Sequence, residues 1–213
     1  MKEFTVEDYQ FLQTFCGHCI TYPDIKPEQI DIRDIAHSHS IMARYNGHGK
    51  VAFSVGAHCL AGVELCQRLA DKAKPEYSQT LGNPEFIKDL KRAFLLHDAS
   101  ECYILDFPRP MKAYFNTLGF GQIHQALEDR IFDVIALKYD IKRTEAIKEW
   151  VDTLDDLTGM AEGQVLYENK KLGGWIEGGV DEDAATTVSF YATLKQPDIE
   201  ELFLLVAEEL GVV

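Results

Sequence analysis

The chain has 213 residues, of which 46% are hydrophobic and 26% are charged. This composition is that of a packed globular protein, and it excludes a disordered or fibrous chain. The 35 acidic and 21 basic residues give a formal net charge of −14, and no basic run is present, which argues against binding to a nucleic-acid polymer. We therefore expect one globular domain over residues 1–213.

Cysteine content and hydropathy limit the setting of the protein. The five cysteines are an odd number without a disulfide-like framework, which favours a reducing, cytoplasmic compartment. Cys16 and Cys19 form a CxxC pair, but no second pair follows at zinc-ribbon spacing, so we interpret them as partly buried core thiols. No stretch approaches the roughly 20 apolar residues that cross a bilayer, and no signal peptide is evident at Met1, so no membrane partner is expected.

The first half of the chain has mainly helical periodicity. Apolar residues at helical spacing predict a helix over residues 5–16, and two prolines make residues 21–30 an extended connector. A second helix is predicted from Asp31 or Asp34 to Arg44. Ser54 is a good N-cap for a third helix that reaches about Ala73.

The second half continues this pattern. Asn83 followed by Pro84 predicts the start of a buried helix that leads into His97 and Asp98. Further expected segments are a rigid loop at 106–110, helices at 123–139 and 144–169, a flexible glycine-rich loop at 172–180, a strand-like stretch at 186–191 and a final helix at 198–210. One short strand has no evident partner, so the predicted class is all-α.

The adjacent His97 and Asp98 are the main candidates for chemistry. A divalent cation that activates water needs several nitrogen and oxygen ligands, and His and Asp supply that mixture. His58 lies on an earlier helix, and a later helix carries three aspartates within two turns. Three helices can therefore converge on one cation. A lone core histidine or a capping aspartate is the simpler explanation of each residue taken singly.

Four segments run in order through the middle of the chain: DIAHSHSIMARYNGHG at 34–49, FSVGAHC at 53–59, FLLHDASECYILDFPRPMK at 94–112 and VDTLDDLTGMAE at 151–162. Together they resemble the HD-superfamily phosphohydrolases, and specifically the 5′-deoxynucleotidase-like branch that includes phage dATP triphosphohydrolases. This gives core motifs over 34–162 and a C-terminal helical extension at 182–213. The resemblance implies a compact HD-type bundle of about seven to nine helices.

The same resemblance implies a set of metal ligands. They are His58, His97, Asp98 and one later aspartate, and together they would hold a divalent ion such as Co²⁺, Mn²⁺, Zn²⁺ or Mg²⁺. Asp155 is chosen because the last aspartate of the family pattern precedes a glutamate by two helical turns. Asp152 is the second choice, and Asp156 stays open. Ala57 stands before His58 where relatives tend to have Gln or Glu, which leaves substrate preference uncertain.

Three further residues acquire roles from the resemblance. Glu101 matches a carboxylate that orients or deprotonates the attacking water, Arg44 matches a phosphate-contacting arginine, and Lys112 adds a second cationic contact. His37 and His48 occupy positions similar to those of the family and either serve the phosphates or only make local hydrogen bonds. His39 receives no role.

The implied activity is hydrolysis of the 5′ phosphate ester of a deoxynucleotide. The substrate is either a deoxynucleoside triphosphate, which releases triphosphate, or a monophosphate, which releases phosphate. The expected partners are this small molecule and further copies of the chain, in the cytoplasm, or in the host cytoplasm if the chain is phage-encoded. The alternatives are a nucleotide-binding regulatory protein without turnover and a metal that only staples helices.

Overall fold

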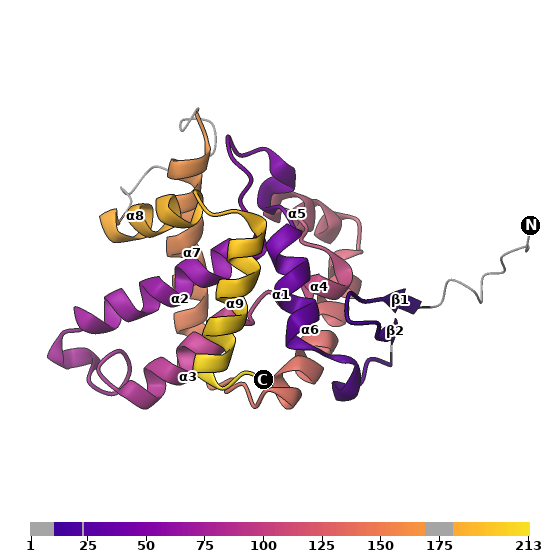
Figure 1. The fold of residues 1–213 in the computed structure, drawn as a ribbon, viewed down its shortest axis with the longest axis horizontal. Helices are drawn as coiled ribbons and strands as arrows, with labels where there is room; N and C mark the ends of the chain where they lie inside the picture. Colours follow the sequence, from indigo (N-terminus) through magenta and orange to yellow (C-terminus); the bar gives the residue numbers. More distant parts are fainter. Residues whose placement is uncertain (1–10, 23, 169–180) are drawn as a thin grey trace, which may run out of the picture.

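The computed structural model describes residues 11–22, 24–168 and 181–213. These residues form nine α-helices and one two-stranded sheet (Figure 1). The predicted all-α class and the range of seven to nine helices are therefore confirmed. The helices are α1 (Ile32–Ile41), α2 (Val55–Asp71), α3 (Pro84–Leu95), α4 (Glu101–Ile104), α5 (Arg109–Thr117), α6 (Gly121–Lys138), α7 (Glu145–Leu166), α8 (Glu182–Tyr191) and α9 (Gln196–Leu210).

Helix α2 is the centre of the fold. It contacts α1, α3, α7, α8 and α9, and a helix surrounded in this way must be apolar on nearly every side. Its first nine residues, Val55–Val63, are all buried. The polar exception in this run is His58, which therefore lies at the middle of the molecule.

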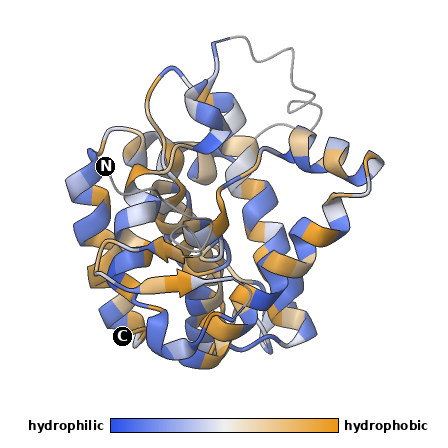
Figure 2. Ribbon diagram, turned by 90° about the vertical axis from the view of Figure 1, so that its right-hand side faces the viewer, coloured by the Kyte–Doolittle hydropathy of each residue, from blue (hydrophilic) through white to orange (hydrophobic). Residues whose placement is uncertain are grey.

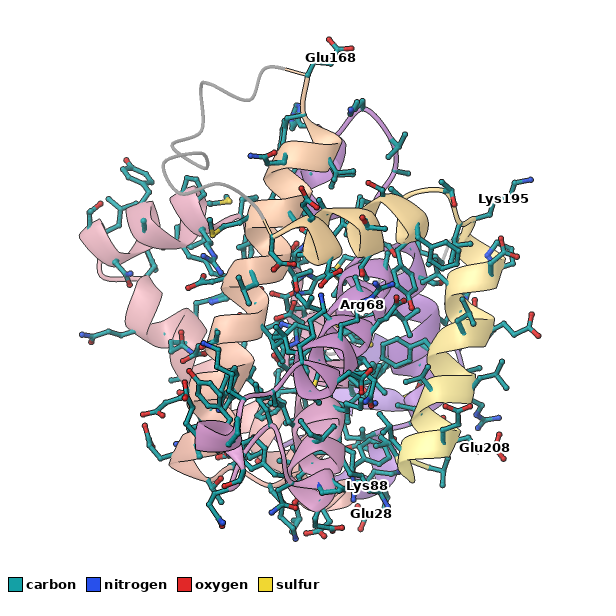
Figure 3. All side chains as sticks on the ribbon, turned by 90° about the vertical axis from the view of Figure 1, so that its left-hand side faces the viewer. Glu28, Arg68, Lys88, Glu168, Lys195 and Glu208 are labelled. Atoms are coloured by element: carbon teal, nitrogen blue, oxygen red, sulfur yellow. The ribbon has the colours of Figure 1, made fainter. Side chains whose placement is uncertain are left out.

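The helix starts follow the predicted capping residues. The side chains of Ser54, Asn83 and Thr144 accept hydrogen bonds from the backbone N–H groups of Ala57, Glu85 and Ile147, at the starts of α2, α3 and α7. Hydrophobic and hydrophilic residues lie on different faces of the outer helices (Figure 2). Charged side chains such as Lys88, Lys195 and Glu208 project outward at the periphery (Figure 3).

The helix predicted over 5–16 is wrong where the structure describes it. Strands β1 (Phe11–Gln13) and β2 (Cys19–Thr21) form an antiparallel hairpin instead, while residues 5–10 lie outside the described residues. Gly17 takes a positive φ of 90° in the turn, where glycine has no steric penalty. The aromatic residues that resembled a helical stripe also suit a strand, and the strand pairing is not visible in the local spacing. Cys16 and Cys19 lie in this hairpin, where Cys16 is partly buried as predicted and Cys19 is exposed, so the prediction is wrong for Cys19.

Two other local predictions are corrected. The strand-like stretch at 186–191 belongs to α8, whose N-cap Asp181 accepts from Ala184 N–H and whose Thr187 and Val188 are buried against neighbouring helices. Tertiary packing overrides β-propensity here. The predicted loop at 106–110 ends earlier, because Arg109 and Pro110 form the first turn of α5, where a proline costs no hydrogen bond.

Several boundaries also differ from the predictions. Helix α1 ends at Ile41, so Arg44 begins a separate 3₁₀ turn, Arg44–Gly47. The glycine-rich loop predicted at 172–180 lies outside the described residues. In the part of the chain that the structure describes, no helix combines the length and the apolar character that a membrane crossing requires.

The final helix, α9, packs on the chain itself. It contacts α1, α2 and α3 and buries Ile199, Phe203 and Ala207. Leu202, Leu204 and Val206 are partly buried against the same core, and Leu205 is exposed. Most of this apolar stripe is therefore used within one chain, and the predicted homo-oligomer stays a prediction.

Gly62 provides a test of the contact between α2 and α3. A Cβ added at Gly62 would lie 1.9 Å from the ring of Phe94, which is fully buried. We expect Gly62→Ala to lower the free energy of unfolding by about 1–3 kcal/mol, measured by urea denaturation, because the ring has no free space to move into. The exposed Gln67→Ala on the same helix is the control and should change stability by less than about 0.5 kcal/mol. Unchanged stability of Gly62→Ala would contradict this close contact.

The burial of His39 leads us to expect that the folded protein loses stability in acid. It is fully buried against Phe203, and among the described residues neither ring nitrogen has a hydrogen-bond partner. Burial lowers the pKa of His39 to about 4. As the pH falls, the imidazole of His39 is therefore protonated first in the unfolded chain. The free energy of unfolding falls between about pH 6.5 and pH 4, by roughly 1.4 kcal/mol per pH unit.

The measurement is the free energy of urea unfolding from pH 7 to pH 4. His39→Leu should flatten this dependence, because it removes the buried ring that resists protonation. The exposed His48→Leu is the matched loss of a histidine and should keep the wild-type slope. Equal slopes in wild type and His39→Leu would show that another group controls the acid sensitivity.

Candidate metal centre

Three parts of the fold bring the predicted ligands together. His58 lies on the first turns of α2, and Asp155 lies in the middle of α7. His97 and Asp98 lie in the tight turn between α3 and α4. Helices α2, α3 and α7 all contact one another, so these side chains point into one space.

The donor atoms are as close as ligands of one ion would be. His58 Nε2 lies 3.3 Å from His97 Nε2 and 3.2 Å from Asp155 Oδ1. Asp98 Oδ2 lies 3.3 Å from His97 Nε2 and 4.0 Å from His58 Nε2. Bonds of about 2.0–2.2 Å to one cation place neighbouring ligand atoms about 3.0–3.5 Å apart. His58, His97 and Asp155 can therefore hold a metal ion, whereas Asp98 is within this range of His97 but not of His58.

Each candidate ligand is also oriented by a second contact. His58 Nδ1 lies 2.5 Å from Glu162 Oε1, and His97 Nδ1 lies 2.7 Å from the Phe94 carbonyl oxygen. In both rings the Nδ1 contact leaves Nε2 facing the shared space. Metal-binding histidines characteristically use the second ring nitrogen in this way. The chemistry of the donor set therefore fits a cation on His58, His97 and Asp155, with Asp98 beside His97.

A second possible ligand group contains Cys59, His97 and Asp98. Burial raises the pKa of the Cys59 thiol well above its usual value, and the charge of Asp98 adds to this effect. A neutral thiol is a poor ligand, so His58 and Asp155 are the better partners for His97.

The structure distinguishes the three aspartates of α7. Asp155 faces His58, whereas Asp152 is exposed and has no contact with the candidate ligands among the described interactions. Asp156 also faces outward and forms an ion pair with Arg109, at 3.0 Å. The choice of Asp155 over Asp152 and Asp156 therefore agrees with the geometry.

Arg109 has a role that sequence reasoning did not assign. Its guanidinium donates to Asp155 Oδ2 at 2.6 Å, which leaves Oδ1 of the same carboxylate directed at His58. The contact joins the start of α5 to α7. Arg109 therefore orients a candidate ligand, and no feature of the sequence pattern pointed to it.

A buried carboxylate, Glu162, connects the centre to the predicted arginine. Glu162 Oε2 accepts from Arg44 Nε at 2.8 Å and from the Tyr45 hydroxyl at 2.6 Å, while its other oxygen faces His58. Arg44 Nη1 also lies 3.5 Å from Asp98 Oδ2. Arg44 is thereby held beside the ligands, and Glu162, used in the sequence only as a spacing marker, is the residue that holds it.

Electrostatics keep His58, Asp98 and Asp155 charged in the ion-free protein. Burial and Arg44 would lower the pKa of His58, but the carboxylates of Glu162 and Asp155 outweigh them and raise it to about 9. Burial would raise the pKa values of Asp98 and Asp155, but the nearby imidazoles and Arg44 hold both below their usual range. A cation that binds here therefore displaces a proton from His58.

Glu101 and Lys112 lie in the same pocket as Arg44, Asp98 and Asp155. Lys112 Nζ lies 3.4 Å from Glu101 Oε1 and 3.0 Å from Glu128 Oε1. Burial raises the pKa of Glu101, and the charge of Asp98 adds to this effect. All three predicted catalytic residues, Arg44, Glu101 and Lys112, are thus brought to the candidate ligands.

The pocket has a volume of about 600 Å³ and combines charged and aromatic walls. Asp106, which sequence reasoning left unassigned, adds a carboxylate whose pKa burial raises. His48 lies at the pocket, but His37 stacks on Phe15 and lies 3.2 Å from Glu200 Oε2, so only its local role is supported.

Comparison with known proteins gives a family but no activity. The chain is 30% identical over 154 residues to the uncharacterized protein RCAP_rcc00048 of Rhodobacter capsulatus, a match that covers 70% of this chain and 69% of that protein. The chain belongs to this family. It is also 30% identical over 131 residues to the uncharacterized protein YfdR of Escherichia coli K12, covering 62% of this chain and 59% of that protein. No protein-family model matches the chain.

Metal binding gives a direct test of the centre. We expect the wild-type chain to bind Mn²⁺ or Co²⁺, and His58→Ala or Asp155→Asn to abolish tight binding, as measured by equilibrium dialysis at pH 8. Glu162→Gln should weaken binding about 10- to 100-fold, because it frees the His58 ring to turn. His37→Ala is the matched control, since His37 lies away from the ligands. Full affinity in a His58→Ala, His97→Ala double variant would rule the centre out.

Proposed function

We propose that the protein is a metal-dependent phosphohydrolase that cleaves the 5′ phosphate ester of a deoxynucleotide. The observation that carries this proposal is one pocket whose wall contains the candidate ligands Asp98 and Asp155 together with Glu101, Arg44 and Lys112. His58 and His97 lie directly behind these two aspartates, at 3.2 and 3.3 Å. The resemblance to HD-type phosphohydrolases supports the same chemistry. A structural metal alone would not need Glu101, Arg44 and Lys112 at the same place.

The charges of the pocket suit a phosphate ester. A divalent cation, when bound, offsets phosphate charge and polarises water. Arg44 lines the pocket and is held in place by Glu162, so its planar guanidinium is fixed before a substrate arrives. Lys112 contributes a second positive charge from α5. The net charge of −14 therefore does not prevent anion binding at this site.

Glu101 is suited to move the proton. Glu101 lines the pocket, and its Oε2 is buried without a hydrogen-bond partner among the described residues. Burial and the charge of Asp98 raise the pKa of Glu101, which favours its protonated form in the ion-free protein, and a bound cation would favour the ionised form. Ionised Glu101 would take a proton from the attacking water. The water oxygen then bonds to phosphorus as the bond to the 5′ oxygen breaks. Glu101 returns the proton to that oxygen, and nucleoside and phosphate or triphosphate leave.

The length of the phosphate chain is the open part of the proposal. Arg44 and Lys112 serve a monophosphate, and Arg109 at the pocket wall offers a further cation for a longer chain. Assays of phosphate and triphosphate release from a panel of dNMPs and dNTPs, each with Co²⁺, Mn²⁺, Mg²⁺ and Zn²⁺, decide between the two. Tight nucleotide binding without any product under every cation would favour a regulatory protein instead.

Replacing Glu101 tests the proposed chemistry separately from metal binding. We expect Glu101→Gln to lower kcat about 10²- to 10⁴-fold, because the amide cannot accept the proton, while Mn²⁺ affinity stays near wild type. Glu128→Gln is the matched control: it removes the other carboxylate partner of Lys112, on α6, and should change kcat far less. Wild-type kcat in Glu101→Gln would refute the assigned base.

A further inference from the structure

Gly159 is a helical glycine that protein packing does not explain. A glycine inside a helix is less stable than an alanine, so it usually marks a close contact. In α2 this reason is present: a Cβ at Gly62 would strike Phe94, and one at Gly56 would lie 3.0 Å from Ile199. At Gly159 an added Cβ would meet no atom of another segment within 4 Å among the described residues.

The open space at Gly159 belongs to the pocket. Asp155, Gly159 and Gly163 recur every four residues along α7, Tyr167 follows the last residue of the helix in an extended conformation, and all four line the cavity. We call this series the α7 stripe. At a rise of 1.5 Å per residue, Gly159 lies about 6 Å and Gly163 about 12 Å along the helix from the candidate ligand Asp155. The stripe therefore leads away from the metal centre.

The two ends of the stripe differ in chemistry. Asp155 lies with the histidines and Arg44, where charge is concentrated. Tyr167 lies at the other end, and its ring contacts the Tyr45 ring edge-on, with centroids 5.6 Å apart. The aromatic wall of Tyr45 and Tyr167 favours a flat, partly apolar group, and the charges of Glu162 and Arg44 next to this wall are paired with each other. The Asp155 end favours phosphate.

An independent observation indicates that a ligand enters this pocket. Glu101 lines the same cavity, is 4% exposed, and has one oxygen without a partner among the described residues. A buried carboxylate oxygen without a hydrogen bond is costly, and a bound molecule in the cavity would satisfy it. Gly159 and Glu101 thus line one cavity.

We propose that the α7 stripe holds the nucleoside part of the deoxynucleotide, with the sugar over Gly159 and the base towards Gly163 and Tyr167. This inference rests on the proposed function for the identity of the ligand. Gly159 is then a specificity-determining residue, because any side chain there occupies the place of the sugar. The helix keeps a less stable residue at this position to leave room for the ligand.

Binding assays separate this proposal from a role in folding. In the Glu101→Gln background, where turnover is slow, dATP and inorganic triphosphate are titrated calorimetrically in the presence of Mn²⁺. We expect Gly159→Leu to weaken dATP binding at least tenfold and to leave triphosphate binding within twofold, because triphosphate uses only the charged end. Thr153→Leu, at an exposed position of the same helix, is the control and should change neither.

The smaller Gly159→Ala variant gives a second readout. Its thermal midpoint should rise by about 2–4 °C, since a helical glycine is replaced without a clash, while dATP affinity falls at least threefold. If Gly159→Leu does not fold, this variant decides. Unchanged dATP affinity, or equal losses for dATP and triphosphate, would overturn the proposal. Absence of hydrolysis by the wild-type chain would refute the proposed function without affecting this binding comparison.

Discussion

The candidate centre depends on the burial of one carboxylate, Glu162. Its side chain is fully buried, and an ionised carboxylate in that position requires charged or hydrogen-bonding partners. Arg44, Tyr45 and His58 supply them, and together they hold the pKa of Glu162 below its usual value although burial opposes this. One residue of α7 therefore fixes the ring of a ligand on α2 and the arginine of the Arg44–Gly47 turn.

The same interaction accounts for the unusual backbone beside Arg44. Tyr45 and Asn46 both have positive φ values, of 57° and 51°, and residues other than glycine rarely adopt such values. The hydrogen bond from the Tyr45 hydroxyl to Glu162 and the contact of its ring with Tyr167 hold this conformation. Strained backbone of this kind persists where surrounding contacts determine it, and it is common at functional sites.

The sequence predicted the parts of the fold whose signals are local. Ser54, Asn83 and Thr144 cap their helices through side-chain hydrogen bonds within three residues, so α2, α3 and α7 were found with nearly correct starts. The predictions of a helix at 5–16 and of a strand at 186–191 were wrong, because strand pairing and helix packing depend on distant residues. Asp155 was selected by a family spacing, and the structure agrees because Asp152 lies on the exposed side of α7.

The residues that sequence reasoning missed share a physical property: they act on other side chains. Arg109 orients Asp155, and Glu162 orients His58 and Arg44, across separations of 46 to 118 residues in the chain. No local pattern encodes such contacts. Helix α7 nevertheless places them in a simple order, because Asp155, Gly159 and Glu162 follow one another at steps of four and three residues on one face. The candidate ligand Asp155, the open space at Gly159 and the buried carboxylate of Glu162 thus lie within two turns of one helix. Helix α7 therefore positions both a candidate metal ligand and the open part of the pocket.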